Sequence, residues 1–357
     1  MIIKNNNTLC PFYIPTEDIN FIFNAVGNNW YKLKNQKLLL TGGTGFIGKW
    51  MLSSFLNANR KLKLFAKVFV VSRDPKLILS KYPLLKDYEE IIWVKKDVRE
   101  LEPEDCRECS YSIHAATDVA EIDSPINIFD TCVIGTKKVL ETLQSYHGRK
   151  RLLILSSGAV YGKIPSNIHY VSEDFCGAPN SMDLSQAYGE GKRASEFQSM
   201  AYASENKELE IVISRCFALV GPHLPLNKHF AIGNFIQSVI ENKNILINGD
   251  GTPLRSYLYT SDLSNWLWKL LFDAPAGQCY NVGSSEAISI FDLALKVNKL
   301  LDGNSSVNIL NNLQTNGLRQ SYLPSTEKIF KELNLKQSIT IDRAIIKTAT
   351  WAKNFNS

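Results

Sequence analysis

The sequence lacks a long apolar run. No stretch approaches the roughly 18 to 20 apolar residues that a membrane-spanning helix needs, and the polar start MIIKNNN has no signal-peptide core. Internal repeats and low-complexity tracts are missing as well. With 45% hydrophobic and 21% charged residues among 357, the composition is that of a globular protein. We therefore expect a cytoplasmic protein without a membrane partner.

An excess of charge of one sign is also lacking. The chain has 40 Lys and Arg against 35 Asp and Glu, a net charge of +5. The basic residues are scattered along the sequence and form no cluster of the kind that binds nucleic acid. This balance argues against a nucleic-acid partner and suits small anionic ligands.

Cysteine gives no sign of a disulfide framework, because seven residues at irregular spacing suit a reducing compartment. Cys106 and Cys109 form a CxxC pair, but no second pair or pair of histidines follows at zinc-site spacing. We predict an ordinary surface loop there. We expect no metal site in this protein.

The length of the chain suggests about two domains. Residues 1–36 form an N-terminal extension with a helix expected to begin near Pro15. Beyond it, short apolar runs alternate with longer amphipathic stretches, which is typical of βαβ units. The runs lie at residues 38–40, 68–71, 91–94, 111–114, 152–155 and 211–213.

We therefore predict an α/β fold with a doubly wound parallel (Rossmann) sheet and a smaller, mixed C-terminal substrate lobe. The dinucleotide-binding domain spans residues 37–215, and the chain returns to it at about 255–282. Residues 216–254 and 283–357 form the substrate lobe.

A glycine-rich turn gives the first chemical signal. Gly42, Gly45 and Gly48 follow the first apolar run and open a helical stretch. The first glycine permits the tight turn, the second admits a pyrophosphate, and the third lets the helix pack against the sheet. The spacing and its setting predict dinucleotide binding, with contacts from Gly42, Thr44, Gly45, Phe46, Ile47 and Gly48.

The end of the next predicted strand bears on the choice of dinucleotide. A carboxylate there bonds the ribose of NAD, whereas an arginine accommodates the 2′-phosphate of NADP. The chain has Arg73 followed by Asp74. We favour NADP(H) with Arg73 on the phosphate; NAD(H) with Asp74 on the ribose stays open.

Tyr188 and Lys192 lie four residues apart and share one face of a helix. A nearby ammonium stabilises a phenolate and lowers its pKa, so this tyrosine could exchange a proton with a sugar oxygen. Ser156 and Ser157 end a strand, where hydroxyls reach the ligand crevice of a parallel sheet. The serine, the tyrosine and the lysine together are far more specific than any one of them.

With these motifs the chain resembles the extended short-chain dehydrogenase/reductase family, in its branch of NAD-dependent epimerases and dehydratases acting on nucleotide sugars. The resemblance runs from about residue 37 to 351. It implies a catalytic triad of Ser157, Tyr188 and Lys192, with Tyr188 and Lys192 also at the cofactor. It further implies cofactor contacts from Asp97, Val98, Ala115 and Ala116, and substrate contacts from Ser157, Asn234 and Arg255, the last on the diphosphate.

One departure from the family pattern argues against a dehydration reaction. The family's 4,6-dehydratases carry acidic or basic groups straight after the catalytic hydroxyl, and Gly158 and Ala159 stand there in this chain. The favoured function is reduction of the 4-keto group of a nucleotide-activated 6-deoxyhexose by NAD(P)H, in surface-polysaccharide (lipopolysaccharide O-antigen) or deoxysugar biosynthesis. Alternatives are a 4-epimerase, a UDP-sugar-acid decarboxylase-like enzyme and a non-catalytic dinucleotide binder.

Other features receive structural interpretations. We expect His223 and His229 to be loop histidines near the substrate entrance. Trp266 and Trp268 are expected to pack a helix. The resembling family also implies a homodimer formed through two long helices.

Overall fold

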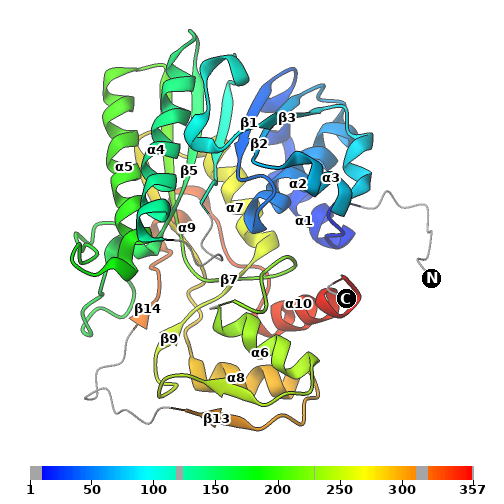
Figure 1. The fold of residues 1–357 in the computed structure, drawn as a ribbon, viewed down its shortest axis with the longest axis vertical. Helices are drawn as coiled ribbons and strands as arrows, with labels where there is room; N and C mark the ends of the chain where they lie inside the picture. Colours follow the sequence, from blue (N-terminus) through cyan, green and yellow to red (C-terminus); the bar gives the residue numbers. More distant parts are fainter. Residues whose placement is uncertain (1–9, 118–123, 229, 311–320, 356–357) are drawn as a thin grey trace.

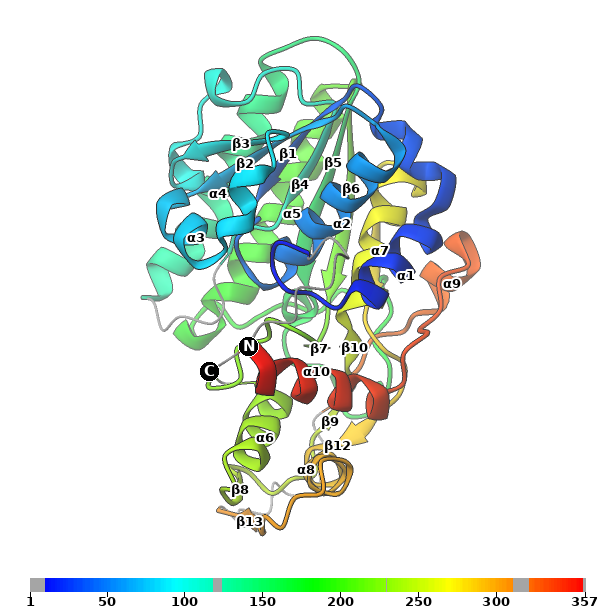
Figure 2. The ribbon, with the colours of Figure 1, turned by 90° about the vertical axis from the view of Figure 1, so that its right-hand side faces the viewer.

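The computed structural model describes residues 10–117, 124–228, 230–310 and 321–355. A parallel sheet with helices on both faces forms the larger part, and a smaller lobe lies beneath the carboxyl ends of its strands (Figures 1 and 2). In the described residues the sheet has seven strands in the order β11-β6-β5-β4-β1-β2-β3. This confirms the predicted doubly wound α/β fold.

The apolar runs of the sequence form the strands of this sheet. All eight residues of β5 are buried, as expected for a parallel strand covered on both faces. β1 pairs with β2 on one side and with β4 on the other, so the strand order reverses beside β1. The strands are β1 (Lys37–Thr41), β2 (Lys67–Ser72), β3 (Ile91–Lys95), β4 (Tyr111–His114), β5 (Lys150–Ser157), β6 (Leu209–Cys216) and β11 (Gln278–Val282).

Two groups of helices cover the sheet. α4 (Pro125–Gln144) and α5 (Ala187–Glu205) pack together on one face. α2 (Phe46–Leu62) and α7 (Thr260–Asp273) cover the other face, and α1 (Thr16–Val26) packs on both of them (Figure 2). The helix expected near Pro15 is therefore present, and it belongs to the layer on the sheet. α3 (Pro75–Lys81) follows β2.

The smaller lobe contains short strands and three helices among the described residues. The helices are α6 (Ala231–Ile240), α8 (Ile290–Leu300) and α10 (Ile341–Phe355), while α9 (Glu327–Leu333) packs near β11. The strand sets are β7 (Leu219–Val220) with β10 (Leu258–Tyr259), β12 (Ile288–Ser289) with β9 (Leu254–Arg255) and β14 (Ser321–Tyr322), and β8 (Ile245–Ile247) with β13 (Val307–Ile309). Short 3-10 helices span Gly27–Leu33, Pro83–Asp87, Val98–Glu100, Pro103–Asp105, Gly158–Tyr161 and Leu184–Gln186.

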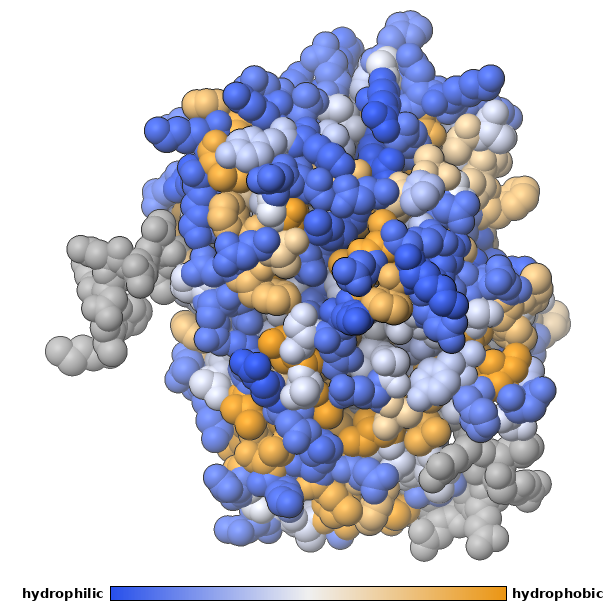
Figure 3. Space-filling model, turned by 180° about the vertical axis from the view of Figure 1, so that it is seen from behind, coloured by the Kyte–Doolittle hydropathy of each residue, from blue (hydrophilic) through white to orange (hydrophobic). Residues whose placement is uncertain are grey.

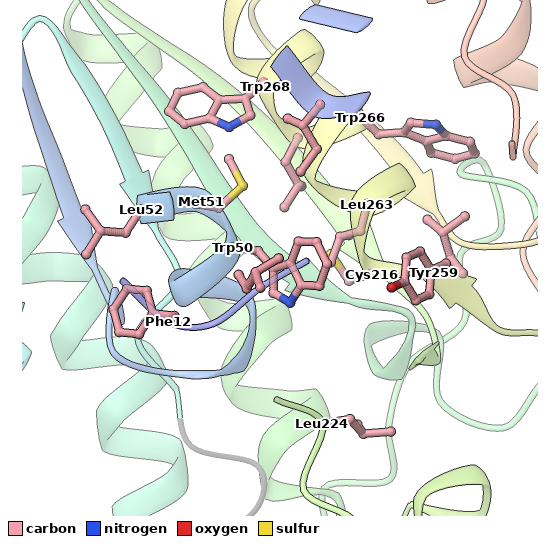
Figure 4. Close-up of a cluster of buried hydrophobic side chains, with 14 of the residues drawn as sticks. Phe12, Trp50, Met51, Leu52, Cys216, Leu224, Tyr259, Leu263, Trp266 and Trp268 are labelled. Atoms are coloured by element: carbon pink, nitrogen blue, oxygen red, sulfur yellow. The ribbon is translucent and has the colours of Figure 1, made fainter. Parts of the chain in front are cut away.

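Tryptophans form the centre of the core between α2, α7 and the N-terminal segment (Figure 4). Trp266 and Trp268 are almost wholly buried, which confirms that they pack a helix. The Trp268 indole donates to Ser54 on α2 at 2.8 Å, and the Trp50 indole donates to the Pro222 carbonyl at 2.9 Å. These bonds join the first helix after the glycine turn to segments far along the chain.

The prediction of a surface loop for the CxxC pair is wrong. Cys106 and Cys109 are fully buried in a hydrophobic cluster with Val98 and Leu101. Burial raises the pKa of both thiols, that of Cys106 to about 12, so they remain protonated at neutral pH. Among the described residues, no group of three possible ligands could hold a metal ion.

The surface seen from behind is a mixture of hydrophilic and hydrophobic residues, with much of the hydrophobic area in its lower half (Figure 3). Nowhere in the described ranges is there a helix with the length and apolar character needed to cross a membrane.

Candidate active site

The glycine turn has the geometry that its sequence predicts. Gly42 adopts a φ of 68°, in the left-handed region that favours glycine. A Cβ at Gly48 would lie 2.0 Å from the Gly42 carbonyl oxygen, so only glycine lets α2 approach β1 this closely. Gly45 precedes α2 without a side-chain cap, and the first-turn N–H groups therefore point toward the cavity as an anion site.

A cavity of about 370 Å³ lies at the carboxyl ends of β1, β2 and β4. It follows the crevice where the strand order reverses, which is the usual ligand site of such sheets. Its wall includes most of the predicted cofactor residues: Gly42, Thr44, Gly45, Phe46, Arg73, Asp97, Val98, Ala115 and Ala116. The other predicted cofactor residues, Ile47, Gly48, Tyr188 and Lys192, do not line this cavity. Gly48 instead lets α2 pack against the glycine turn. Thr117, Ile128 and Thr131 complete the far side.

Basic side chains gather in the cavity wall at the ends of β2 and β3 and at the start of α2. Lys49, Arg73, Lys96 and Arg99 line it together with the carboxylate of Asp97, and Lys96 pairs with Glu102 and Asp105. Asp97 accepts hydrogen bonds from the Arg99 guanidinium at 2.9 and 3.0 Å, which holds the pKa of Asp97 below its usual range. Its carboxylate is thus already paired within the wall.

Asp74 does not line this cavity. Its carboxylate accepts the backbone N–H of Leu77 at 3.1 Å and caps α3. Arg73, in contrast, is in the wall and close enough to Asp97 to lower that residue's pKa. The residue that follows β2 in the cavity wall is therefore a cation and not a carboxylate.

The predicted triad comes together at the end of β5 and the start of α5. Tyr188 is the second residue of α5, and Lys192 follows one turn later. The Lys192 ammonium donates to the Leu155 carbonyl at 2.8 Å and lies 5.8 Å from the centre of the Tyr188 ring. Ser157 ends β5, and its hydroxyl accepts the N–H of Ala159 at 3.1 Å.

Burial controls the protonation of this centre. It raises the pKa of Tyr188 above the usual 10, and hydrogen bonding to Ser157 opposes only part of that effect. Burial also lowers the pKa of Lys192, whose side chain is almost wholly enclosed. The expectation of a lowered pKa for Tyr188 is wrong for this arrangement, because desolvation of the phenol outweighs the effects that lower its pKa.

A second phenol, which the sequence did not reveal, shares Ser157. Hydrogen bonding to Ser157 also acts on Tyr322 of β14, although burial raises the pKa of Tyr322 to about 12. A Cβ at Gly158 would lie 2.7 Å from the Tyr322 oxygen and 2.6 Å from the Phe217 ring. Glycine at 158 thus leaves room for a tyrosine from the smaller lobe.

Beneath Ser157 lies a buried ion pair. Glu196 of α5 accepts from the Arg215 guanidinium at 2.7 Å and from the Ser156 hydroxyl at 2.5 Å. Arg215 also donates to the Tyr161 hydroxyl at 2.9 Å. These bonds fix α5 to the ends of β5 and β6, and so fix the position of Tyr188.

The predicted substrate residues are less closely gathered. Arg255 of β9 is the register partner of Tyr322 and lies 5.8 Å from the centre of its ring, so it belongs to the same end of the site. Asn234 lies in the first turn of α6, and no contact of its side chain joins it to the triad in the residues described. His223 lines the dinucleotide cavity, and His229 lies outside the described residues.

A family model decides the relationship. The model of the NAD dependent epimerase/dehydratase family matches residues 38–283, which include the glycine turn and the triad. The chain belongs to this family. That membership confirms the resemblance on which the triad was predicted, and it makes the chain a member of an enzyme family that acts on nucleotide sugars.

Curated relatives of the family are similar over most of the chain. UDP-glucuronic acid decarboxylase 1 of Xenopus tropicalis is 24% identical over 88% of this chain and 71% of its own length. UDP-glucuronic acid decarboxylase 6 of Arabidopsis thaliana is 26% identical over 80% of each.

Solved structures of the family share the fold. UDP-glucuronic acid 4-epimerase of Bacillus cereus superposes with a TM-score of 0.75 at 21% identity, covering 89% of this chain and 99% of that one. The dTDP-glucose 4,6-dehydratase of Bacillus anthracis gives a TM-score of 0.73 at 21% identity, over 89% and 97%.

Proposed function

We propose that the protein transfers hydride between NADP(H) and C4 of a nucleotide-activated sugar, and that its net reaction is reduction of a 4-keto group. The observation that carries this proposal is the cation at the end of β2, because Arg73 lies in the cavity wall while Asp74 caps α3. An arginine there suits the 2′-phosphate of NADP(H), and a preference for NADP(H) suits net consumption of reducing power. Tyr188 is protonated at neutral pH and can donate the proton that the alkoxide formed by reduction requires.

The cavity fits a dinucleotide. Glycines make room at the turn, the uncapped start of α2 suits a pyrophosphate, and the cationic wall at β2 suits a 2′-phosphate. When bound, the nicotinamide supplies or accepts hydride. Arg73 would hold the phosphate, whereas Asp74 is engaged in capping α3.

Four residues of the chain then have separate roles in the reaction. Tyr188 donates its proton to the sugar oxygen at C4, and Ser157 holds that oxygen by a hydrogen bond. Lys192 places positive charge near the phenolate that remains and favours it electrostatically. Arg255 offers a guanidinium to the diphosphate of the substrate.

A second candidate is favoured by the relatives. Curated proteins similar to this chain include UDP-glucuronic acid decarboxylases, and a 4-epimerase shares the fold. In this candidate the chain oxidises C4 of a UDP-sugar or UDP-sugar acid, and Tyr188 acts first as a base. Reduction is preferred as the first candidate because Arg73 suits NADP(H), whereas an enzyme that recycles one bound NAD needs no such preference.

The test follows the absorbance of the reduced cofactor. Purified protein is mixed with dTDP-4-keto-6-deoxyglucose and NADPH, then with NADH, and in parallel with UDP-glucuronic acid and NAD⁺. Stoichiometric NADPH oxidation supports the reductase. Product sugar or CO₂ from UDP-glucuronic acid without net cofactor consumption overturns it in favour of the second candidate.

Tyr188→Phe completes the test. It should abolish turnover by about 10² to 10⁴-fold while cofactor binding survives. The matched control is Tyr31→Phe, because Tyr31 is 52% exposed in the N-terminal part of the chain. Equal turnover of Tyr188→Phe and the wild type would refute the role of Tyr188 as the acid, whereas no turnover by the wild type with either substrate pair would leave a dinucleotide-binding protein.

We further propose a homodimer that works in the cytoplasm. Apolar side chains on the two long helices support the assembly: Ile126 and Ile134 on α4 are 61% and 38% exposed, and Phe197 on α5 is 79% exposed. All seven cysteines are free, as a reducing compartment would keep them. Light scattering on the purified chain tests the dimer, and Phe197→Glu should dissociate it.

A further inference from the structure

The loop after β7 forms part of the cavity wall in an unusual conformation. His223 and Pro225 line the dinucleotide cavity. The backbone of His223 has a φ of 73°, in the left-handed region that residues other than glycine seldom adopt. Such a conformation persists only where surrounding contacts hold it.

The N-terminal segment, residues 10–14, supplies one of these contacts. The Nε2 atom of His223 lies 2.7 Å from the carbonyl oxygen of Phe12. A carbonyl only accepts, so Nε2 carries the hydrogen and donates it, which leaves Nδ1 as an acceptor. The Phe12 side chain is fully buried and packs edge-on against Tyr82 at 4.9 Å, beside the α2 residues of Figure 4.

The C-terminal helix supplies the other contact. The Trp351 ring of α10 lies 4.5 Å from the His223 ring, and its indole N–H donates to the Tyr13 carbonyl at 3.0 Å. Tyr13 in turn stacks on Phe355 at 5.3 Å. The two ends of the chain therefore meet on the imidazole, one at its Nε2 atom and the other on its face.

The imidazole is also uncharged. Burial, with a smaller contribution from the nearby Lys49 ammonium, lowers the pKa of His223 to about 3. Lys49 lines the same cavity and lies 5.4 Å from the centre of the Tyr82 ring. The cavity wall thus contains a neutral imidazole and a cation, and such a pair suits a ribose hydroxyl next to a phosphate.

We propose that His223 contacts the bound dinucleotide, and that residues 10–14 together with Trp351 position it. The N-terminal segment then contributes to cofactor binding by positioning His223. This inference rests on the proposed function in one respect, that the cavity holds a dinucleotide.

A double-mutant cycle on the full chain tests the proposal. His223→Phe keeps a ring against Trp351 and removes the bond to Phe12, whereas Phe12→Ala removes the anchor of the segment. We measure the dissociation constant of NADPH by fluorescence and that of the sugar nucleotide by calorimetry. Each single variant should weaken NADPH binding at least about fivefold and leave sugar-nucleotide binding within about twofold.

The coupling separates positioning from packing. If the segment acts through His223, the double variant binds NADPH no less tightly than whichever single variant has the larger dissociation constant. Phe65→Ala is the matched control, because Phe65 is 72% exposed, and it should bind as the wild type does. If Phe12→Ala does not fold, Trp351→Phe replaces it, since that variant loses the bond to Tyr13 and keeps the ring.

Two results overturn the proposal. One is NADPH binding within about twofold of the wild type in His223→Phe; the other is simple additivity in the double variant. Failure of the premise that the cavity holds a dinucleotide looks different, because the wild type itself would then bind neither NADPH nor NADH.

Discussion

Arg73→Ala should change the choice of cofactor. The structure places this guanidinium in the cavity wall at the end of β2. Charge-assisted bonds between a guanidinium and a phosphate contribute about 1.5 to 3 kcal/mol. Arg73 is exposed, so water screens the interaction and the lower end of that range applies. A loss of about 1.5 to 2 kcal/mol corresponds to about a 10- to 30-fold fall in kcat/KM for NADPH.

The assay compares kcat/KM for NADPH and for NADH in each variant. Arg73→Ala should reduce the value for NADPH and leave that for NADH within about threefold. Asp74→Asn should leave both unchanged, because asparagine caps a helix as well as aspartate does. Lys76→Ala, an exposed change outside the cavity wall, controls for the loss of a positive charge. An unchanged NADPH preference in Arg73→Ala, or loss of NADH use in Asp74→Asn, refutes the reasoning.

Further substitutions examine the site and its support. Tyr322→Phe should lower kcat several-fold with little change in KM, because Ser157 loses one of its two phenol partners; an unchanged kcat and pH profile would contradict this role. Gly48→Ala should lower the free energy of unfolding by about 1 to 3 kcal/mol in denaturant melts, since its Cβ would meet the Gly42 carbonyl, and an unaltered midpoint would count against that packing. Burial lowers the pKa of His114 to about 3, so the unfolded chain binds its proton first and stability falls as pH drops from about 6.5 toward 3. His114→Gln should reduce that acid sensitivity by up to about 1.4 kcal/mol per pH unit, and identical melting curves against pH would exclude it.

The sheet and the cofactor turn were predictable because their signals are local. Each apolar run is bounded by glycine or polar residues, and the glycine spacing specifies a turn whose geometry Gly42 and Gly48 realise. Asp74 is a contrasting case. Its use as a cap for α3 depends on where the helix begins, and the sequence suggested only a contact with the ribose of NAD(H) for it.

The remaining features depend on contacts between distant segments. Cys106 and Cys109 lie in a polar stretch of sequence, yet the cluster around Leu101 buries them. Tyr322 reaches Gly158 only after the smaller lobe has folded back on the sheet. The rise in the pKa of Tyr188 follows from desolvation of the phenol, and the spacing of residues in the sequence does not reveal how deeply a side chain is buried.

The edge strand β11 and the covering helix α7 have a consequence for the order of synthesis. Both follow the first half of the smaller lobe in the sequence, and both pack on the cofactor sheet. A ribosome therefore releases the glycine turn and the triad long before the strand and helix that complete their support. A fragment ending near residue 215 would expose the edge of β6, and unpaired strand edges invite association between chains. Folding to the native state thus requires α7 and β11, which are synthesised after most of the sheet. Contacts of such large sequence separation predict slow formation of the native state.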